Sequence, residues 1–309
     1  MSRRGWLLFL AMGVIWGVPY LLIKIAVEEM SPAVLVLART ALGAALLLPI
    51  AAAKGQLRPL LRHWRPLLVY TVIEICVPWL MLGYAETQLS SSLTGLLVAA
   101  VPLVGAVLVR VTGHESLERR RVAGLLVGFA GVAALVGFDV GSANIWPVVA
   151  VAVTAFCYAL GPLILARHLS DRPGLGVVAA SLAITAVIYL PVGVAQWPTA
   201  PVSTEAWLSV VGLAVVCTAL AFLIFFQLIA EVGPSRATVI TYMNPAVALV
   251  LGVIVLDESV TRATLVGFGL ILAGSVLATA RDRTPEPARP RQAATDADAR
   301  CLANPLPEP

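Results

Sequence analysis

The sequence repeats itself at a constant offset of 143 positions. Six residues of the first half return in the second half without a gap: Pro102, Glu115, Ser116, Arg119, Gly124 and Gly131 correspond to Pro245, Glu258, Ser259, Arg262, Gly267 and Gly274. Three further pairs share the offset: Pro19 and Pro162, Lys24 and Arg167, and Trp64 and Trp207. Two related halves in an apolar chain are typical of secondary transporters.

The composition of the chain indicates that its solvent is lipid. Of its 309 residues, 60% are hydrophobic and 12% are charged, and the mean hydropathy is +0.93. Soluble domains are about 45–50% apolar and about 25% charged. The apolar runs are about 20 residues long and lack strict alternation, as expected of membrane-spanning helices and not of barrel strands. The predicted fold class is therefore an all-α membrane protein.

Ten spans are predicted, at approximately 6–27, 32–53, 66–88, 92–112, 121–138, 146–166, 175–196, 207–229, 236–256 and 263–280. The first run follows Arg3 and Arg4 as in a signal peptide. It continues to about Val27 without a cleavage site, so we expect a retained span. The segment 281–309 is rich in Pro, Arg, Asp and Ala without periodicity, and we expect a disordered cytoplasmic tail.

The basic residues predict the topology. With the N-terminus inside, eighteen of the 21 Lys and Arg residues fall on the cytoplasmic side, so both termini are expected there. Each half, 5–138 and 146–280, holds five predicted spans. Because five is odd, the second half must enter the membrane from the opposite side, which gives two inverted five-helix repeats. Such a pair predicts a substrate site near the midplane that is exposed alternately to each side. Short loops and high Ala and Arg content favour a bacterial inner membrane.

Three ionisable residues lie inside predicted spans, where a charge costs about 2.5–3.5 kcal/mol. Glu74 and Arg39 lie in the antiparallel spans 3 and 2 and could meet near the midplane. Either Glu74 binds a proton or a cationic group and Arg39 binds an anionic group, or the two form an ion pair that only joins the helices. Lys24, near the outer end of span 1, is expected to reach the lipid headgroups.

A second candidate set consists of aromatic and amide side chains in or near the ends of spans 1, 3, 6, 8 and 9. They can either line a substrate pathway or pack. The set comprises Trp16, Tyr20, Trp79, Tyr84, Tyr158, Gln227, Tyr242 and Asn244. Pro102 and Pro245 are expected to interrupt spans 4 and 9 near the midplane and to free carbonyl groups there.

The segments after spans 4 and 9 share a charged pattern. Glu115 and Glu258 are each followed four residues later by an arginine, Arg119 or Arg262. We interpret these pairs either as helix caps or as gates on opposite sides of the membrane. Spans 5 and 10 also carry small-residue faces, which indicate helix packing or a homodimer interface. Their glycines are Gly124, Gly128, Gly131, Gly267 and Gly274.

The motifs of several other function classes are absent from the sequence. It has no P-loop, HExxH or Gly-x-Ser-x-Gly motif, so we expect no enzyme activity. Its four cysteines and three histidines lack metal-ligand spacing, so neither a metal nor another cofactor is expected. The pI near 9.1 reflects basic loops that set topology. The expected partners are therefore the lipid bilayer and a small-molecule substrate, and not nucleic acid.

The start of the chain resembles a known family. Trp16-Gly17-x-x-Tyr20-x-x-x-Lys24, then Ser31-Pro32 and Arg39, is similar to the opening of an EamA domain of the drug/metabolite transporter superfamily. The proline of span 4, the glutamate thirteen residues later and the glycines of span 5 resemble the close of that domain. The second half repeats this close. The resemblance covers roughly residues 5–280.

This resemblance implies ten spans in two EamA repeats and the export of small metabolites, often amino acids or related compounds. It also implies a central cavity lined mainly by spans 1, 3, 4, 6, 8 and 9. The second half departs from the opening motif, because Ala159, Leu160 and Leu182 replace the equivalents of Trp16, Gly17 and Arg39. An asymmetric cavity is therefore expected.

Three functions fit these features to different degrees. The first is a secondary transporter that exports a small polar metabolite, with proton exchange through Glu74. The second is a passive uniporter or channel of the same fold, in which Glu74 and Arg39 are structural. The third is a non-transport membrane scaffold or embedded enzyme, which the inverted repeat disfavours because such a protein has no need of alternating access.

Overall fold

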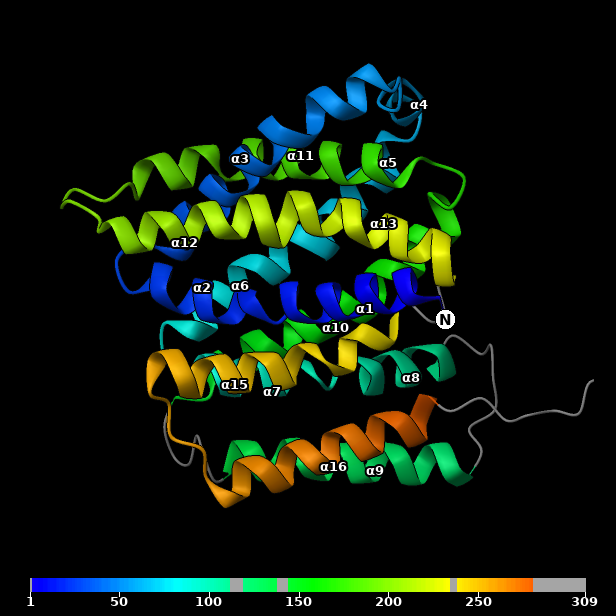
Figure 1. Ribbon diagram of the computed structural model, residues 1–309, viewed down its shortest axis with the longest axis vertical. Coiled ribbons are helices and arrows are strands. Elements are labelled where there is room, and N and C mark those ends of the chain that lie inside the picture. The colour runs from blue at the N-terminus through cyan, green and yellow to red at the C-terminus, as the bar shows by residue number, and fades with distance from the viewer. Residues whose placement is uncertain (1, 112–118, 138–143, 234–237, 280–309) are drawn as a thin grey trace, which may run out of the picture. The chain divides into compact units, whose positions relative to one another are not determined.

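The computed structural model describes residues 2–111, 119–137, 144–233 and 238–279. Within them every regular element is helical, and they belong to one compact unit that ends at Thr279 (Figure 1). The α-helices are α1 (Arg3–Ile15), α2 (Val18–Val27), α3 (Pro32–Ala53), α4 (Arg58–Leu61), α5 (Trp64–Thr71), α6 (Val77–Glu86), α7 (Ser91–Val98), α8 (Val101–Val111), α9 (Arg119–Leu135), α10 (Trp146–His168), α11 (Gly174–Ala195), α12 (Thr204–Ala214), α13 (Ala221–Val232), α15 (Asn244–Leu256) and α16 (Arg262–Thr279). The predicted tail, 281–309, lies outside the described residues.

Seven segments of the described chain are long and apolar enough to cross a membrane: Arg3–Val27, Pro32–Ala53, Trp64–Glu86, Ser91–Leu108, Trp146–His168, Gly174–Ala195 and Thr204–Val232. Three apolar helices are shorter, with 10–17 residues: Val122–Leu135, Ile240–Leu256 and Arg262–Ala278. Each of these ten segments overlaps one predicted span, and the all-helical class is confirmed. A span needs roughly 20 residues, so the count of ten stays a prediction.

The helices pair across the two halves of the chain. Two helices pack against their own counterpart at the repeat offset, α3 against α11 and α9 against α16, and α7 packs against α15, the counterpart of α8. Further cross-half contacts include α2 with α12 and α6 with α10. The offset relates these two contacts at the level of whole spans, since it maps α2 onto part of α10 and α12 onto α5, which belongs to the same span as α6. Figure 1 shows α3 beside α11 and α9 beside α16. This pairing is consistent with two repeats related by a two-fold axis.

The small-residue faces of α9 and α16 pack against each other. A Cβ added to Gly131 would lie 2.7 Å from the carbonyl oxygen of Gly267, and one on Gly124 would lie 2.8 Å from that of Gly274. Only glycine allows the two backbones to approach this closely. Of the two predicted roles of these glycines, the structure therefore assigns them to packing within the chain, and this face is not free for a homodimer.

Two π-helical turns, Val72–Cys76 and Val215–Leu220, occupy equivalent places in the two halves. Their first residues are separated by the same offset of 143 positions. The first turn precedes Pro78, which cannot donate the hydrogen bond that the carbonyl of Glu74 would accept in an α-helix. The extra residue of a π-turn rotates the side chains that follow it, and such turns often lie at functional sites.

The prolines predicted to interrupt spans 4 and 9 lie at helix starts. Pro102 is the second residue of α8, and α7 ends at Val98. Pro245 is the second residue of α15, which follows a 3-10 turn at Thr238–Tyr242. The first N–H groups of a helix have no intrahelical partner, so proline costs no hydrogen bond there. Both spans are therefore divided into separate helical segments.

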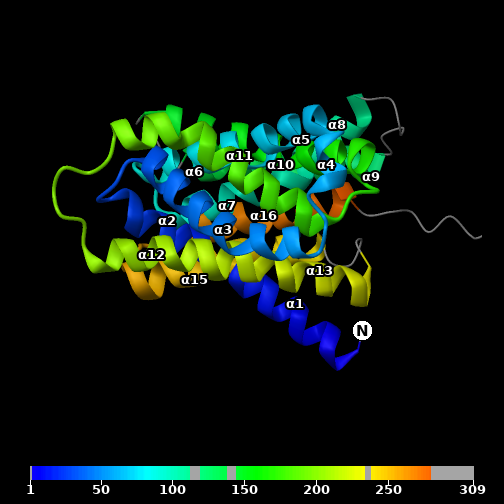
Figure 2. The same ribbon diagram turned by 90° about the horizontal axis from the view of Figure 1, so that it is seen from above.

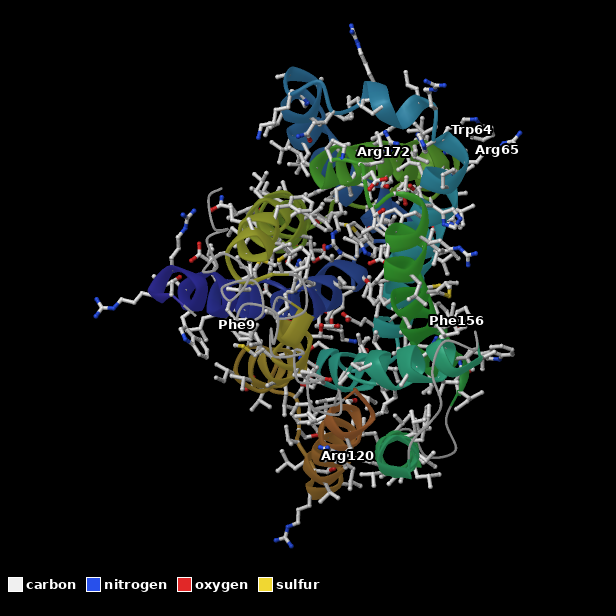
Figure 3. All side chains as sticks on the ribbon, turned by 90° about the vertical axis from the view of Figure 1, so that its right-hand side faces the viewer. Phe9, Trp64, Arg65, Arg120, Phe156 and Arg172 are labelled. Atoms are coloured by element: carbon white, nitrogen blue, oxygen red, sulfur yellow. The ribbon has the colours of Figure 1, made fainter. Side chains whose placement is uncertain are left out.

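The two ends of the unit differ in charge. One end holds the start of α1, α4 and the starts of α5 and α9; Figure 3 looks onto this basic end, where it labels Arg65, Arg120 and Arg172. At the other end α2, α6 and α15 finish and α7 and α12 begin (Figures 1 and 2). We call this the acidic end, because Glu29, Glu86 and Glu258 lie there.

Candidate functional site

Glu74 occupies the middle of the first π-turn, between α5 and α6. Its Oε2 atom is buried and has no hydrogen-bond partner among the described residues. The carboxylate faces Gly161 of α10, where a Cβ atom would overlap Oε2. The missing side chain of Gly161 therefore provides the space that the Glu74 carboxylate fills.

The π-turn around Glu74 is held by polar contacts with α11. The Tyr189 hydroxyl donates to the carbonyl of Cys76 (2.9 Å), and the hydroxyl of Thr71 donates to that of Ser181 (2.8 Å). The Cys76 thiol lies 3.3 Å from the Thr185 hydroxyl. The Tyr189 bond satisfies a carbonyl of the irregular turn, which would otherwise cost free energy inside a membrane, and the other two contacts join the side chains of the two halves. They leave the Glu74 carboxylate unsatisfied.

Arg39 of α3 is buried and has partners other than Glu74. Its Nε donates to the hydroxyl of Thr218 (3.0 Å), and its guanidinium carbon lies 3.6 Å from the centre of the Trp79 ring. Thr218 belongs to the second π-turn and donates in turn to the carbonyl of Leu213 (2.8 Å). The structure therefore lacks the Arg39–Glu74 ion pair, which was one of the two interpretations, since Arg39 binds the second half instead.

Tyr158 of α10 connects the two charged groups. It lies within electrostatic range of both Glu74 and Arg39, and it also interacts with the side chain of Trp79. Cys217, the counterpart of Glu74 at the repeat offset, lies near Arg39. The two π-turns thus contribute an acid in one half and a thiol in the other. The site around Arg39 is chemically asymmetric, as the departures from the opening motif predicted.

The other aromatic candidates are divided between this region and the packing of helices. Trp16 contacts Phe225 (4.7 Å between ring centres) and Phe222 (5.9 Å), both on α13. Tyr20 is buried in one apolar cluster, and Tyr84 and Tyr158 pack against that cluster. Tyr242 ends the 3-10 turn before α15.

The two amide candidates make structural contacts. With its amide nitrogen toward these acceptors, Asn244 donates to the carbonyls of Ile240 (3.0 Å) and Gly13 (3.3 Å). It therefore joins α15 to α1. Gln227 is exposed on α13, and its Oε1 accepts from Arg4 (3.3 Å). This contact puts it at the basic end, and its place in a substrate pathway stays a prediction.

The acidic end contains a buried carboxylate that the sequence analysis missed. Glu86, the last residue of α6, is 0% exposed, and neither of its carboxylate oxygens has a partner within the described chain. Lys24 does not reach toward headgroups as predicted: its ammonium donates to the carbonyls of Glu86 (2.9 Å) and Leu89 (3.2 Å). Glu86 lies at the end of a predicted span, where a carboxylate normally faces water, so no sequence signal marked it.

Glu258 binds the first half of the chain. Its two carboxylate oxygens accept the backbone N–H groups of Ser91 (2.7 Å) and Ser92 (2.9 Å), at the start of α7. This is a helix cap made by a residue far away in the sequence. Arg262 begins α16. Glu115 and the side chain of Arg119 lie outside the described residues, so their predicted pair has no structural description.

The chain is similar to known transporters. The EamA-like transporter family matches it twice, over residues 3–137 and 145–280. The uncharacterized transporter YvbV of Bacillus subtilis is 28% identical, over 91% of this chain and 93% of that one. The uncharacterized inner membrane transporter YedA of Escherichia coli K12 is also 28% identical, over 87% and 88% of the two chains.

One further relative is named as an exporter, and one solved structure resembles the structure of this chain. A probable terminal-alkyne amino-acid exporter of Streptantibioticus cattleyicolor is 27% identical, over 91% of this chain and 95% of its own. A solved crystal structure of 22% sequence identity superposes with a TM-score of 0.65, over 90% of this chain and 98% of that chain. The second likeness shows a shared fold.

Proposed function

Because this chain belongs to the EamA-like transporter family and is a multi-pass membrane transporter, we propose that it exports small metabolites, namely amino acids or related compounds, by alternating access. The observation that supports the proposal best is the unpartnered Glu74 carboxylate, which lies in a π-turn near Tyr158. A buried carboxylate without a partner is costly and needs a ligand or a proton.

The proposed architecture is ten spans in two inverted repeats, 5–138 and 146–280, with both termini in the cytoplasm of a bacterial cell and the body in its inner membrane. Two findings support it: the cross-half helix pairs, and the two π-turns at the repeat offset. In this topology the basic end faces the cytoplasm, in agreement with the positive-inside rule. The acidic end then faces outward.

The proposed substrate class follows from two opposite charges on neighbouring helices. Glu74 can accept an ammonium group, and Arg39 can bind a carboxylate with the nitrogens that Thr218 does not occupy. Trp79 and Tyr158 offer aromatic surfaces beside them. A compound with an amine and a carboxylate at its two ends fits this arrangement. The printed name of the Streptantibioticus relative, an amino-acid exporter, agrees with that class.

The proposed coupling is proton exchange at Glu74. In the outward-facing state Glu74 binds a proton as the amine leaves, and in the inward-facing state it releases the proton as the next amine binds. One proton then moves inward for each substrate that moves outward. In a passive uniporter, by contrast, Arg39 and Glu74 would only hold the helices, and their substitution would not change the pH dependence of transport.

The test compares metabolites in the medium of cells that express the wild type, Glu74→Gln or an empty vector. We expect one class of amino compounds to accumulate outside with the wild type only. Equal accumulation with wild type and variant would support the uniporter. If the wild type and the vector give the same medium, the export proposal is wrong. Glu28→Gln is the matched control, because Glu28 is an exposed carboxylate after α2.

A further inference from the structure

The acidic end holds a group of buried polar atoms that no contact satisfies. Both carboxylate oxygens of Glu86 and the hydroxyl oxygens of Ser91 and Ser92 are buried without a hydrogen-bond partner in the described part of the protein. Glu86 and Ser91 are 0% exposed, and Ser92 is 4% exposed. An unpaired buried hydroxyl costs about 1–3 kcal/mol and a buried charge costs more, so this region is stable only when its charge is compensated.

The charged and titratable groups around Glu86 come from several helices. Lys24 and Tyr20 of α2 and Glu258 after α15 lie within electrostatic range of its carboxylate. Of the other helices packed on α6, α10 contributes Tyr158, which interacts with Tyr20. The Arg39 side chain of α3 lies over Trp79, about two helical turns from Glu86. Lys24 is the cation that lies within electrostatic range of Glu86 among the described residues, and its ammonium binds carbonyls and not the carboxylate.

We propose that Glu86 is a second proton-binding site of the transporter, at the acidic end, and that its charge determines the partner of Lys24. When Glu86 carries a proton taken from the water outside, Lys24 stays on the carbonyls of Glu86 and Leu89, as in this structure. When the proton leaves, the ammonium moves to the carboxylate and releases the turn between α6 and α7. The only bond made or broken is the O–H bond of the Glu86 carboxyl group, as one proton is exchanged with water.

This exchange affects a contact between the two halves. The turn that Lys24 holds leads directly into Ser91 and Ser92, whose backbone N–H groups bind Glu258. The side-chain oxygens of the same three residues crowd Gly252 of α15: a Cβ there would lie 3.0 Å from the Ser91 hydroxyl and would overlap the Ser92 hydroxyl and Oε2 of Glu258. Loosening the turn therefore loosens α7 from α15. Deprotonated Glu86 favours an open acidic end, and protonated Glu86 favours the closed end seen here.

A proton fits this site better than a metal ion. The ammonium of Lys24 lies beside Glu86 and would repel a second cation, whereas a proton only removes the charge of the carboxylate. Within the described residues, no group of three His, Cys, Asp or Glu side chains could hold a metal. The proposal concerns the acidic end and does not depend on Glu74 or on the identity of the substrate.

The test measures the accessibility of the turn in the purified full-length protein in nanodiscs. Leu89 is 7% exposed, so a single reporter, Leu89→Cys, is placed there after the four natural cysteines are replaced. Its labelling by a hydrophilic maleimide is measured between pH 5 and pH 9. Thr87→Cys, at an exposed position of the same turn, corrects for the pH dependence of thiol reactivity. With Glu86 present, we expect the labelling rate of Leu89→Cys, divided by that of Thr87→Cys, to rise at least about fivefold between pH 5 and pH 9.

Variants separate the proton site from a structural role. Glu86→Gln should keep the ratio low at every pH, Glu86→Asp should keep the pH dependence, and Lys24→Met should give a high ratio throughout. Glu28→Gln, at an exposed carboxylate of the same end, should behave as the wild type. The proposal fails if Glu86→Gln retains the pH dependence, or if the Asp and Gln variants lose it alike.

Discussion

At the residue scale, Glu74 and Glu86 lie on the same span but differ in their neighbours. Glu74 faces Gly161, with Tyr158 nearby, and within the described chain its buried Oε2 has no partner. Glu86 has Lys24 within electrostatic range, yet the ammonium is occupied by carbonyls. A ligand ammonium can therefore replace a proton at Glu74, whereas at Glu86 a lysine is already positioned for that role. The two acids are suited to substrate exchange and to conformational control, respectively.

Gly161→Ala tests whether the position of the Glu74 carboxylate matters. The added methyl would occupy the place of Oε2 and should displace the carboxylate, so we expect export to fall at least about tenfold, equivalent to about 1.4 kcal/mol. Export is measured as the initial rate in cells at equal expression. Gly269→Ala is the matched control, because no atom lies within 4 Å of its added Cβ. Normal export by Gly161→Ala would exclude a role for the carboxylate in this position.

Glu29 provides a prediction about pH and stability outside the spans. Its carboxylate accepts from the Ser203 hydroxyl and from the Ser203 backbone N–H (2.6 Å), and these bonds lower the pKa of Glu29 below its usual value. A lowered folded-state pKa contributes stability above the unfolded value, about 4.3, which is lost as pH falls through the folded value. The Tm of Glu29→Gln should therefore lie below that of the wild type at pH 7, and the difference should shrink as pH falls below the usual pKa of a glutamate side chain. A constant difference across this range would contradict the prediction.

At the element scale, the spans were predictable and the site was only partly so. Apolar runs of about 20 residues mark the helices, and the repeat offset marks equivalent segments. The π-turns were not predicted, because the proline that follows the first of them, Pro78, is not distinctive: Pro49 and Pro162 lie inside α-helices. The ion pair between Arg39 and Glu74, one of the two interpretations of these residues, does not form for a related reason. Arg39 bonds to Thr218, a residue 179 positions away, and no local spacing encodes that contact.

Gly124→Ala tests the packing of α9 on α16. The new Cβ would lie 2.5 Å from the backbone nitrogen of Ala278 and 2.8 Å from the carbonyl oxygen of Gly274. Backbone atoms cannot move aside as side chains do, so the helices must separate, at a cost of about 1–3 kcal/mol. Thermal unfolding in detergent should show a lower Tm. Gly269→Ala, at an uncrowded position of α16, should leave the Tm unchanged or slightly raise it.

At the scale of the whole molecule, polar contacts join the two halves at both ends. At the basic end the Ser2 hydroxyl donates to Glu231 (2.5 Å). At the acidic end Ser203 binds Glu29, and Glu258 binds the start of α7. Alternating access requires one end to open while the other stays closed. These contacts are exposed or lie at helix ends, where bonds can break at small cost, whereas between the ends the two halves are joined by packed helices and by buried bonds such as that from Arg39 to Thr218.

A cross-link at the acidic end tests whether that end opens during transport. Glu29 follows α2 and Ser203 caps α12, so Glu29→Cys with Ser203→Cys can be joined by a short bifunctional thiol reagent in a protein without its natural cysteines. If α2 and α12 separate in each cycle, cross-linking should reduce export at least about tenfold. A reagent with a reducible bond allows export to be restored by dithiothreitol. The two single variants, treated in the same way, should retain export within about twofold. Full export by the cross-linked protein would mean that α2 and α12 move as one body, and the opening would then have to lie between α7 and α15, where Glu258 binds.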